Sequence, residues 1–257
     1  MPDTLFVLKI GGHVLAQAEV LADVLDQFAR REGPKLLIHG GGKRASQIGK
    51  ALGIPAQMHE GRRITDADTL EVVTMVYAGL YNKRLVAELQ ARSCNALGMS
   101  GADANSIQAH KRTGTAIDYG YVGDIDAVDA EGIDRLLVAG FTPVFCAITH
   151  DKQGQLLNTN ADTIAATLAA AFAKKYTVHL QFCFERPGVL RDAERDDSLI
   201  PTISWEEYQS YREQGIIHSG MLPKLENAFA ALRAGVKNVE VSSHEDIGSF
   251  AGTTLHL

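Results

Sequence analysis

Two glycine-rich turns are the first features of this sequence that could do chemistry. Lys9-Ile-Gly-Gly12 ends an apolar, strand-like run, and Gly40-Gly-Gly42 follows a second such run and opens a helical pattern. Glycine lets the backbone come close to a ligand, and a helix N-terminus presents N–H groups and a positive dipole to an anion. Because ligands of open α/β sheets bind at the carboxyl ends of strands, two such turns on adjacent strands predict a phosphate or carboxylate site.

Two familiar nucleotide motifs can be compared with the second turn. A Walker A loop needs a glycine where Leu37 stands and Ser or Thr where Arg44 stands, so that interpretation fails. The dinucleotide fingerprint accepts Gly40-Gly-Gly-Lys-Arg-Ala45, but this segment follows the second strand, and the acidic residue about 20 positions further on, Glu60, ends no convincing strand. A nucleotide-dependent oxidoreductase therefore stays only as an outside alternative.

A few charged residues have the placement that phosphoryl chemistry needs. Lys9 is the only charged residue of the first strand-like run and stands near its carboxyl end, where burial without an anion would be costly. Asp162 follows a dense polar run and opens an alanine-rich helix, which Asn160 can cap. Lys224, in the first turn of a later helix, opposes the helix dipole unless an anion is bound. The pair Arg62-Arg63 could grip a carboxylate or form a solvated basic turn.

These residues require a framework in which strands and helices alternate. Short apolar runs alternate with helical patterns along the chain, which is typical of a parallel sheet covered on both faces. Ser204 and Glu207 have capping-box spacing, and 105–124 indicates a small hairpin or flap. We predict a doubly wound α/β fold with strands at 4–10, 35–39, 94–98, 142–147, 177–183 and 237–241, and helices at 15–31, 43–52, 66–92, 127–139, 160–175, 204–214 and 220–235.

Composition limits the class of protein. The chain has 257 residues, 46% hydrophobic and 22% charged, and its net charge of −6 leaves no broad basic face for nucleic acid. Its three cysteines lie far apart in apolar runs and its nine histidines form no metal-binding motif, so we expect buried thiols and no metal cage. A strand-like N-terminus without a leader and the lack of a long apolar run predict a cytoplasmic protein with no membrane partner.

The order and spacing of these segments resemble the amino acid kinase family, and within it the branch that phosphorylates N-acetyl-L-glutamate. The resemblance covers 1–257 as one domain and implies an open, mainly parallel sheet in an αβα sandwich, with an acyl-amino-acid lobe at about 1–175 and a nucleotide lobe at about 176–257. The matching segments are Lys9-Ile-Gly-Gly12, His39-Gly-Gly-Gly42, Gly61-Arg-Arg-Ile-Thr65, Asn82-Lys83, Gly98-Met-Ser-Gly101 with Asp103, Val122-Gly-Asp124, Asn158-Thr-Asn-Ala-Asp162, Gly220-Met-Leu-Pro-Lys224 and Gly252-Thr253.

The resemblance also implies a reaction and a role for each candidate residue. The enzyme would move the γ-phosphoryl of ATP, with Mg²⁺ carried in by the nucleotide, onto the side-chain carboxylate of N-acetyl-L-glutamate, in the route to ornithine and arginine. A glutamate carboxylate, with an ordinary pKa of about 4.3, is ionised near neutral pH, so no catalytic base is needed. The implied roles are charge neutralisation by Lys9 and Lys224, orientation of those lysines by Asp162, binding of phosphoryl and carboxylate groups by the N–H groups of Gly11, Gly12, Gly41 and Gly42, substrate binding by Arg63 and Asn158, and nucleotide binding by Glu185.

Two departures from the family pattern leave alternatives open. Relatives usually carry a Ser-Asp pair shortly before Gly188, where this chain has Phe182-Cys-Phe-Glu-Arg-Pro, so that Glu185 stands in for the acid. Arginine-inhibited members carry an extra N-terminal helix, and Lys9 comes too early for one. The alternatives are a kinase of the same fold acting on carbamate, aspartate, glutamate or UMP, a kinase for N-succinyl-L-glutamate, and a non-catalytic ligand-binding homologue. The resemblance further implies a homodimer.

Overall fold

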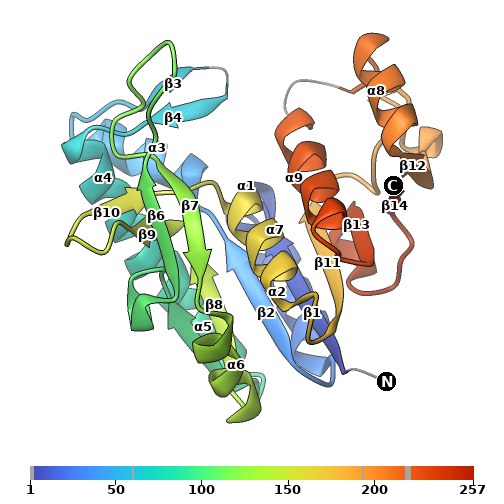
Figure 1. The fold of residues 1–257 in the computed structure, drawn as a ribbon, viewed down its shortest axis with the longest axis horizontal. Coiled ribbons are helices and arrows are strands. Elements are labelled where there is room, and N and C mark those ends of the chain that lie inside the picture. Colours follow the sequence, from blue (N-terminus) through green and yellow to red (C-terminus); the bar gives the residue numbers. More distant parts are fainter. Residues whose placement is uncertain (1–2, 60, 193, 218–220) are drawn as a thin grey trace. The chain divides into compact units, whose positions relative to one another are not determined.

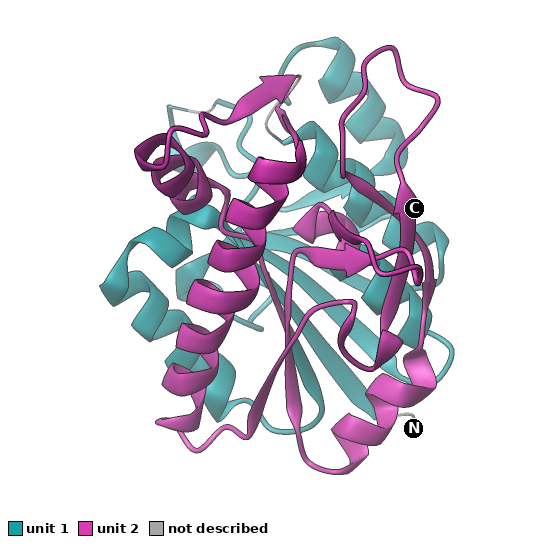
Figure 2. Ribbon diagram, turned by 90° about the vertical axis from the view of Figure 1, so that its left-hand side faces the viewer, with its two compact units in different colours: residues 1–36, 165–257 teal, residues 37–164 magenta. Residues whose placement is uncertain are grey.

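The computed structural model describes residues 3–59, 61–192, 194–217 and 221–257, and the chain folds into two compact units (Figure 2). Unit 1 is formed by residues 1–36 and 165–257, and unit 2 by residues 37–164. The chain passes from one unit to the other within strand β2 (Lys35–His39) and again within helix α7 (Ala161–Phe172). Glu60 and Gly220, which belong to motifs discussed above, lie outside the described residues.

Unit 1 is built on a mainly parallel sheet (Figure 1). Its described strands are, in spatial order, β12 (Thr202–Ser204), β14 (Thr253–His256), β13 (Asn238–Ser243), β11 (Thr177–Phe184) and β1 (Thr4–Ile10). β1 pairs in parallel with β11, where Lys9 lies opposite Phe182, and β11 pairs in parallel with β13. β14 reverses the direction, since it is antiparallel to β13 and parallel to β12.

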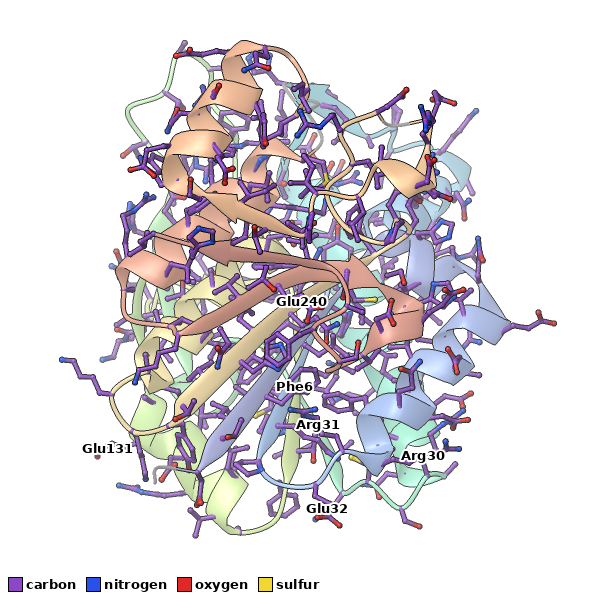
Figure 3. All side chains as sticks on the ribbon, turned by 90° about the vertical axis from the view of Figure 1, so that its right-hand side faces the viewer. Phe6, Arg30, Arg31, Glu32, Glu131 and Glu240 are labelled. Carbon is purple, nitrogen blue, oxygen red and sulfur yellow. The ribbon has the colours of Figure 1, made fainter. Side chains whose placement is uncertain are left out.

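Both faces of this sheet are covered. Every residue from Leu5 to Ile10 in β1, and from Val178 to Cys183 in β11, is buried, so neither face of these two strands meets solvent. Arg31 lies 4.2 Å above the ring of Phe6, and Glu240 of β13 is fully buried (Figure 3). The α-helices in the described part of this unit are α1 (Gly12–Ala16), α2 (Ala18–Arg30), α8 (Trp205–Glu213), α9 (Leu222–Arg233) and the part of α7 beyond Ile164.

Unit 2 combines parallel strands with a second sheet of mixed direction. β2 pairs in parallel with β8 (Thr142–Cys146), which pairs in parallel with β5 (Ala96–Met99). A second sheet contains β10 (Leu156–Asn158), β9 (Ile148–His150), β6 (Ile107–Lys111) and β7 (Gly123–Val128), and β3 (Gln57–His59) pairs with β4 (Arg62–Ile64). The antiparallel β6–β7 pair confirms the hairpin expected at 105–124, and its connecting segment makes isolated bridges to Thr65 and Asn158.

A long helical segment of unit 2 changes its type midway. α4 (Ala67–Thr74) begins after Asp66, whose carboxylate accepts a hydrogen bond from the Thr69 N–H. It passes into a π-helix at Met75–Tyr81 and then into α5 (Asn82–Gln90). Single π-helical turns are frequent at functional sites. The other helices in the described part of this unit are α3 (Gly42–Ala51), α6 (Ala130–Val138), a 3₁₀ turn at Asp103–Asn105 and the start of α7.

Most of these elements agree with the prediction. The six expected strands are β1, β2, β5, β8, β11 and β13, and the capping box of Ser204 and Glu207 opens α8. The helix expected at 15–31 is wrong in detail, because two helices meet at Gln17, and six short strands lie outside the predicted elements. Mainly parallel pairing of buried strands, with helices between them, confirms the α/β class. No helix within the described ranges has the length and apolar character that a membrane crossing requires.

Candidate active site

The second glycine turn joins β2 to α3 in unit 2. A Cβ atom at Gly41 would lie 2.8 Å from ring carbons of both Tyr77 and Tyr81, so only glycine fits at this position. Gly42 is the first residue of α3. Because the first N–H groups of a helix have no intrahelical partner, the turn offers hydrogen-bond donors to an anion.

Arg63 of β4 is fixed against this turn. Its Nη2 atom donates to the carbonyl oxygen of Gly42 at 2.9 Å and to Oγ of Ser46 at 2.8 Å. The hydroxyl of Tyr77 lies on the same side of Gly42, since a Cβ atom there would be 3.8 Å from the tyrosine oxygen and 3.7 Å from Nη2 of Arg63. Burial raises the pKa of Tyr77, and the positive charge of Arg63 opposes that rise. Arg63 is therefore an ordered cation rather than a solvated surface arginine.

Asn158 ends β10 and is tied to the residues that follow Arg63. Its Nδ2 donates to Oγ1 of Thr65 at 2.9 Å, and its backbone N–H donates to the Tyr121 carbonyl. Thr65 is fully buried and pairs with the β6–β7 connection, since its N–H donates to the Tyr119 carbonyl and its own carbonyl accepts from Tyr121. The predicted site residues that these contacts connect within unit 2 are Gly41, Gly42, Arg63 and Asn158.

Asp162 lies in the first turn of α7 and is buried. The cap of this helix is Asn160, whose Oδ1 accepts hydrogen bonds from the backbone N–H groups of Asp162 and Thr163. Helix capping therefore accounts for Asn160 but does not account for the buried carboxylate of Asp162.

The first glycine turn follows β1 in unit 1. Lys9 is buried near the end of that strand, with 7% of its surface exposed. A Cβ atom at Gly11 would lie 3.6 Å from the Cys183 carbonyl oxygen, and Gly12 begins α1. Burial raises the pKa of the Cys183 thiol to about 12, although the charge of Lys9 works against that rise. The thiol is therefore protonated near neutral pH and is not a nucleophile.

Glu185 follows β11 and contacts the same turn. Its carboxylate lies 2.9 Å from Nδ1 of His13, and Nε2 of His13 lies 3.0 Å from the Gln17 amide. Both side chains of the pair are partly exposed. The sequence predicts a nucleotide-binding role for Glu185 but not its contact with His13. The position of His13 directly after a glycine turn is the signal that could have indicated it.

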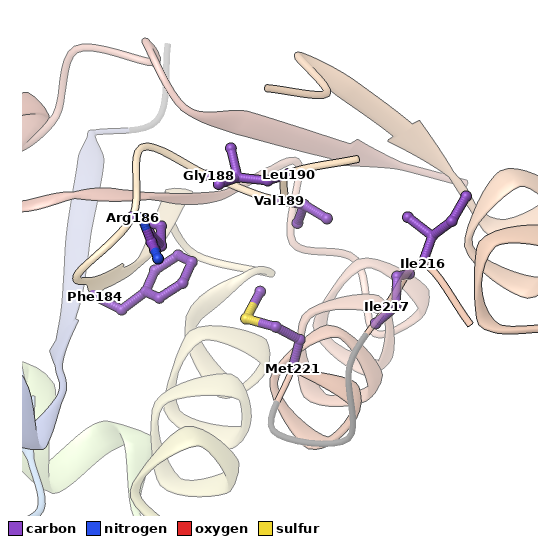
Figure 4. Close-up of a pocket in the computed structure, with 8 residues that line it drawn as sticks. All are labelled: Phe184, Arg186, Gly188, Val189, Leu190, Ile216, Ile217 and Met221. Carbon is purple, nitrogen blue, oxygen red and sulfur yellow. The ribbon is translucent and has the colours of Figure 1, made fainter. Parts of the chain in front are cut away.

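A pocket opens in unit 1 beyond the end of β11 (Figure 4). It contains about 370 Å³ of space, part of which is open solvent. Figure 4 shows the side chains of Phe184, Val189 and Met221 around one common space. The charged lining residue Arg186 is held by Asp196 at 2.9 Å. The lining residues are Phe184, Arg186, Gly188, Val189, Leu190, Ile216, Ile217 and Met221.

Lys224 follows the pocket residue Met221 closely in the sequence. It is half-buried in the first turn of α9, which begins directly after the pocket residue Met221. Pro223 occupies a first-turn position, where a missing N–H costs the helix nothing. The pocket and Lys224 therefore share one helix N-terminus.

Several members of this arrangement carry no signal in the sequence. Ser46 and Tyr77 lie in ordinary amphipathic patterns, and only their contacts with Arg63 mark them. The pocket combines residues between Phe184 and Leu190 with Ile216, Ile217 and Met221, which are far apart in the sequence and mostly look like ordinary apolar positions.

The fold and these contacts define a class of protein. Glycine turns at the ends of parallel strands, with an ordered arginine beside one of them, are typical of α/β proteins that bind phosphate and carboxylate ligands. The profile of the Amino acid kinase family matches residues 4–243, and the chain belongs to that family.

Individual relatives resemble the chain over nearly its full length. A protein from Parabacteroides distasonis named acetylglutamate kinase is 50% identical over 253 residues, which cover 98% of this chain and 99% of the relative. Another of the same name, from Cytophaga hutchinsonii, is 49% identical over 244 residues, 95% of this chain and 92% of the relative. A Streptococcus mutans protein of solved structure shares the fold with a TM-score of 0.81 at 24% identity, over 98% of both chains.

Proposed function

We propose that this chain transfers the γ-phosphoryl of MgATP to the side-chain carboxylate of N-acetyl-L-glutamate, giving N-acetyl-L-glutamyl 5-phosphate in arginine biosynthesis. The observation that carries the proposal is the near full-length identity with relatives named acetylglutamate kinase. The ordered Arg63 beside the second glycine turn supports an anionic acceptor of this kind.

The reaction requires alignment and charge neutralisation rather than proton removal. The acceptor carboxylate is already ionised near neutral pH, so its oxygen attacks the γ-phosphorus directly while the bond to ADP breaks. Lys9 and Lys224 neutralise the charge on the moving phosphoryl group, and Asp162 orients the two lysines. The N–H groups of Gly11 and Gly12 bind the phosphoryl oxygens, where fixed donors are most effective.

The acceptor is held by residues of unit 2. The Arg63 guanidinium binds the α-carboxylate, since its planar fork matches a carboxylate. The N–H groups of Gly41 and Gly42 receive the side-chain carboxylate, and Asn158 holds the acylamino group. These roles are consistent with the contacts that join the Gly42 turn, Arg63 and Thr65.

The nucleotide is held by residues of unit 1. The apolar pocket beside β11 and α9 suits a nucleobase, and Glu185 lies at its β11 end. Mg²⁺ enters with ATP, because this ion binds substrate phosphates and water more readily than an all-protein cage. We assign the acyl-amino-acid lobe to about 1–175 and the nucleotide lobe to about 176–257, and we expect a cytoplasmic homodimer that binds neither nucleic acid nor membranes.

A hydroxylamine trap tests the function directly. An acyl phosphate reacts with hydroxylamine to give a hydroxamate, whereas phosphorylation of a hydroxyl group or of a phosphate does not. We expect hydroxamate and ADP in equal amounts with N-acetyl-L-glutamate, and less with N-succinyl-L-glutamate, L-glutamate or L-aspartate. ADP release without hydroxamate, or preference for another acceptor in the panel, would overturn the assignment. The Lys9→Ala variant controls for contaminating kinases.

A further inference from the structure

Tyr77 is a buried tyrosine in the π-helical turn Met75–Tyr81, with 5% of its surface exposed. Its ring packs on the second glycine turn, since a Cβ atom at Gly41 would lie 2.8 Å from its Cδ1 and 3.1 Å from its Cε1. Tyr81 meets the same position with its Cδ2 at 2.8 Å. The two rings together define the space around the Gly41 backbone, and ring packing alone does not distinguish them.

The hydroxyl group of Tyr77 lies on the same side of Gly42 as the Arg63 guanidinium. A Cβ atom placed on Gly42 would lie 3.8 Å from the tyrosine oxygen and 3.7 Å from Nη2 of Arg63. A guanidinium has N–H donors only, so the tyrosine oxygen can act towards Arg63 as an acceptor. The same guanidinium donates to the Gly42 carbonyl and to Ser46 Oγ. Two oxygen atoms of the protein therefore hold Arg63, and the Tyr77 oxygen lies close to the guanidinium.

This arrangement determines the plane of the guanidinium. The N–H groups of arginine lie in one rigid plane, and a bidentate pair with a carboxylate forms only when that plane faces both oxygens. Removal of the neighbouring tyrosine oxygen would leave the positive charge in place but allow the plane to turn. A phenylalanine at position 77 would fill the same space against Gly41 without holding Arg63.

We propose that Tyr77 is a positioning residue for the acceptor substrate, whose hydroxyl keeps the Arg63 guanidinium in the orientation that binds the substrate α-carboxylate. The inference rests on the function proposed above and deepens it. It also gives the π-helical turn a purpose, because the altered helix carries the tyrosine oxygen to Arg63 while both rings remain packed on Gly41.

Two matched variants separate the hydroxyl from the ring. Tyr77→Phe removes the oxygen that contacts Arg63, and Tyr81→Phe removes the corresponding oxygen from the second ring on Gly41. We expect Tyr77→Phe to raise KM for N-acetyl-L-glutamate about tenfold, in the range for a hydrogen bond to a charged group, with kcat and KM for MgATP changed less than about twofold. Tyr81→Phe should leave all three constants within about twofold of the wild type.

A double-mutant cycle makes the test specific for Arg63. If Tyr77 acts through Arg63, then Tyr77→Phe should have no further effect on acceptor KM in an Arg63→Ala background. Additive effects of the two substitutions, equal changes in the KM values for both substrates, or an unchanged acceptor KM in Tyr77→Phe would each overturn the inference.

Failure of the proposed function has a different signature. A wild-type enzyme that forms no hydroxamate would contradict the function, and calorimetric titration with N-acetyl-L-glutamate would then test the inference by itself. Weaker binding to Tyr77→Phe than to the wild type and Tyr81→Phe would support it. Equal binding to all three proteins, or no binding to the wild type, would overturn it.

Discussion

His13 and Glu185 contact each other between the carboxyl ends of two neighbouring parallel strands, with 2.9 Å between the imidazole Nδ1 and the carboxylate. His13 follows the glycine turn after β1, and Glu185 follows β11. The pair therefore links the proposed phosphoryl-binding turn to the strand that leads into the pocket of unit 1.

Replacement of Glu185 by alanine should loosen this turn and raise KM for MgATP. Because a partly exposed pair contributes about 1 kcal/mol at most, we expect a change of about fivefold or less. Glu185→Gln, which keeps a hydrogen-bond acceptor for His13, should have a smaller effect. Steady-state kinetics with Glu32→Gln as a surface control would measure both. An equal rise in KM for the acceptor would contradict a role confined to the nucleotide.

Lys9→Ala and Lys224→Ala should each lower kcat by a factor on the order of 10² or more, because both charges act on the transition state. The KM values should change only modestly. Lys237→Ala, which removes an exposed lysine of unit 1, is the matched control. A variant of Lys9 or Lys224 with near wild-type kcat would exclude that lysine from the reaction.

Arg63→Ala should raise KM for N-acetyl-L-glutamate by at least about tenfold and leave KM for MgATP nearly unchanged, since its proposed partner is the substrate carboxylate. Arg63→Lys should recover only part of the affinity, because an ammonium group cannot form the planar bidentate pair. Arg84→Ala on the exposed surface of α5 is the control. Equal damage to both affinities would assign Arg63 a structural role instead.

His39 makes the folded state sensitive to acid. The ring is fully buried, its Nδ1 donates to the Gly40 carbonyl, and its Nε2 accepts from the Asn82 amide. Burial lowers the pKa of His39 from 6.5 to about 4. The unfolded chain then binds the proton more readily than the folded one, so stability falls as the pH drops from about 6.5 to about 4.

The size of this effect can be measured with His39→Gln. A pKa difference of this size corresponds to about 3 kcal/mol in the free energy of unfolding. Urea unfolding at pH 7 and pH 4 should show that the wild type loses about this much more stability than the variant. Parallel losses in the two proteins would mean that His39 is protonated in the folded state at the lower pH.

The sequence predicts features whose cause lies within a few neighbouring residues. Lys9 and Glu207 were predictable because a charge near a strand end and a capping-box glutamate show themselves within a few residues. The π-helix at Met75–Tyr81 was not, since its residues fit an ordinary amphipathic helix. Tyr77 is informative only because it lies near Arg63, and Met221 only because it lines the same pocket as Phe184. Such pairings depend on tertiary packing and leave no periodic pattern.

The interleaved chain order has a consequence for biosynthesis. Unit 1 is made of residues 1–36 and 165–257, so it cannot fold completely until the second segment has been synthesised. Its strand β1 pairs with β11, which starts at Thr177. At typical ribosomal speeds of about 5–20 residues per second, β1 waits roughly 10–30 s for β11 to emerge. During that interval the apolar run Leu5–Ile10, buried on both faces in the finished protein, lacks the strand that pairs with it along its whole length. A nascent chain halted near residue 165 should therefore present this run to holdase chaperones, whereas residues 37–164 already include every strand partner of β5, β6 and β8.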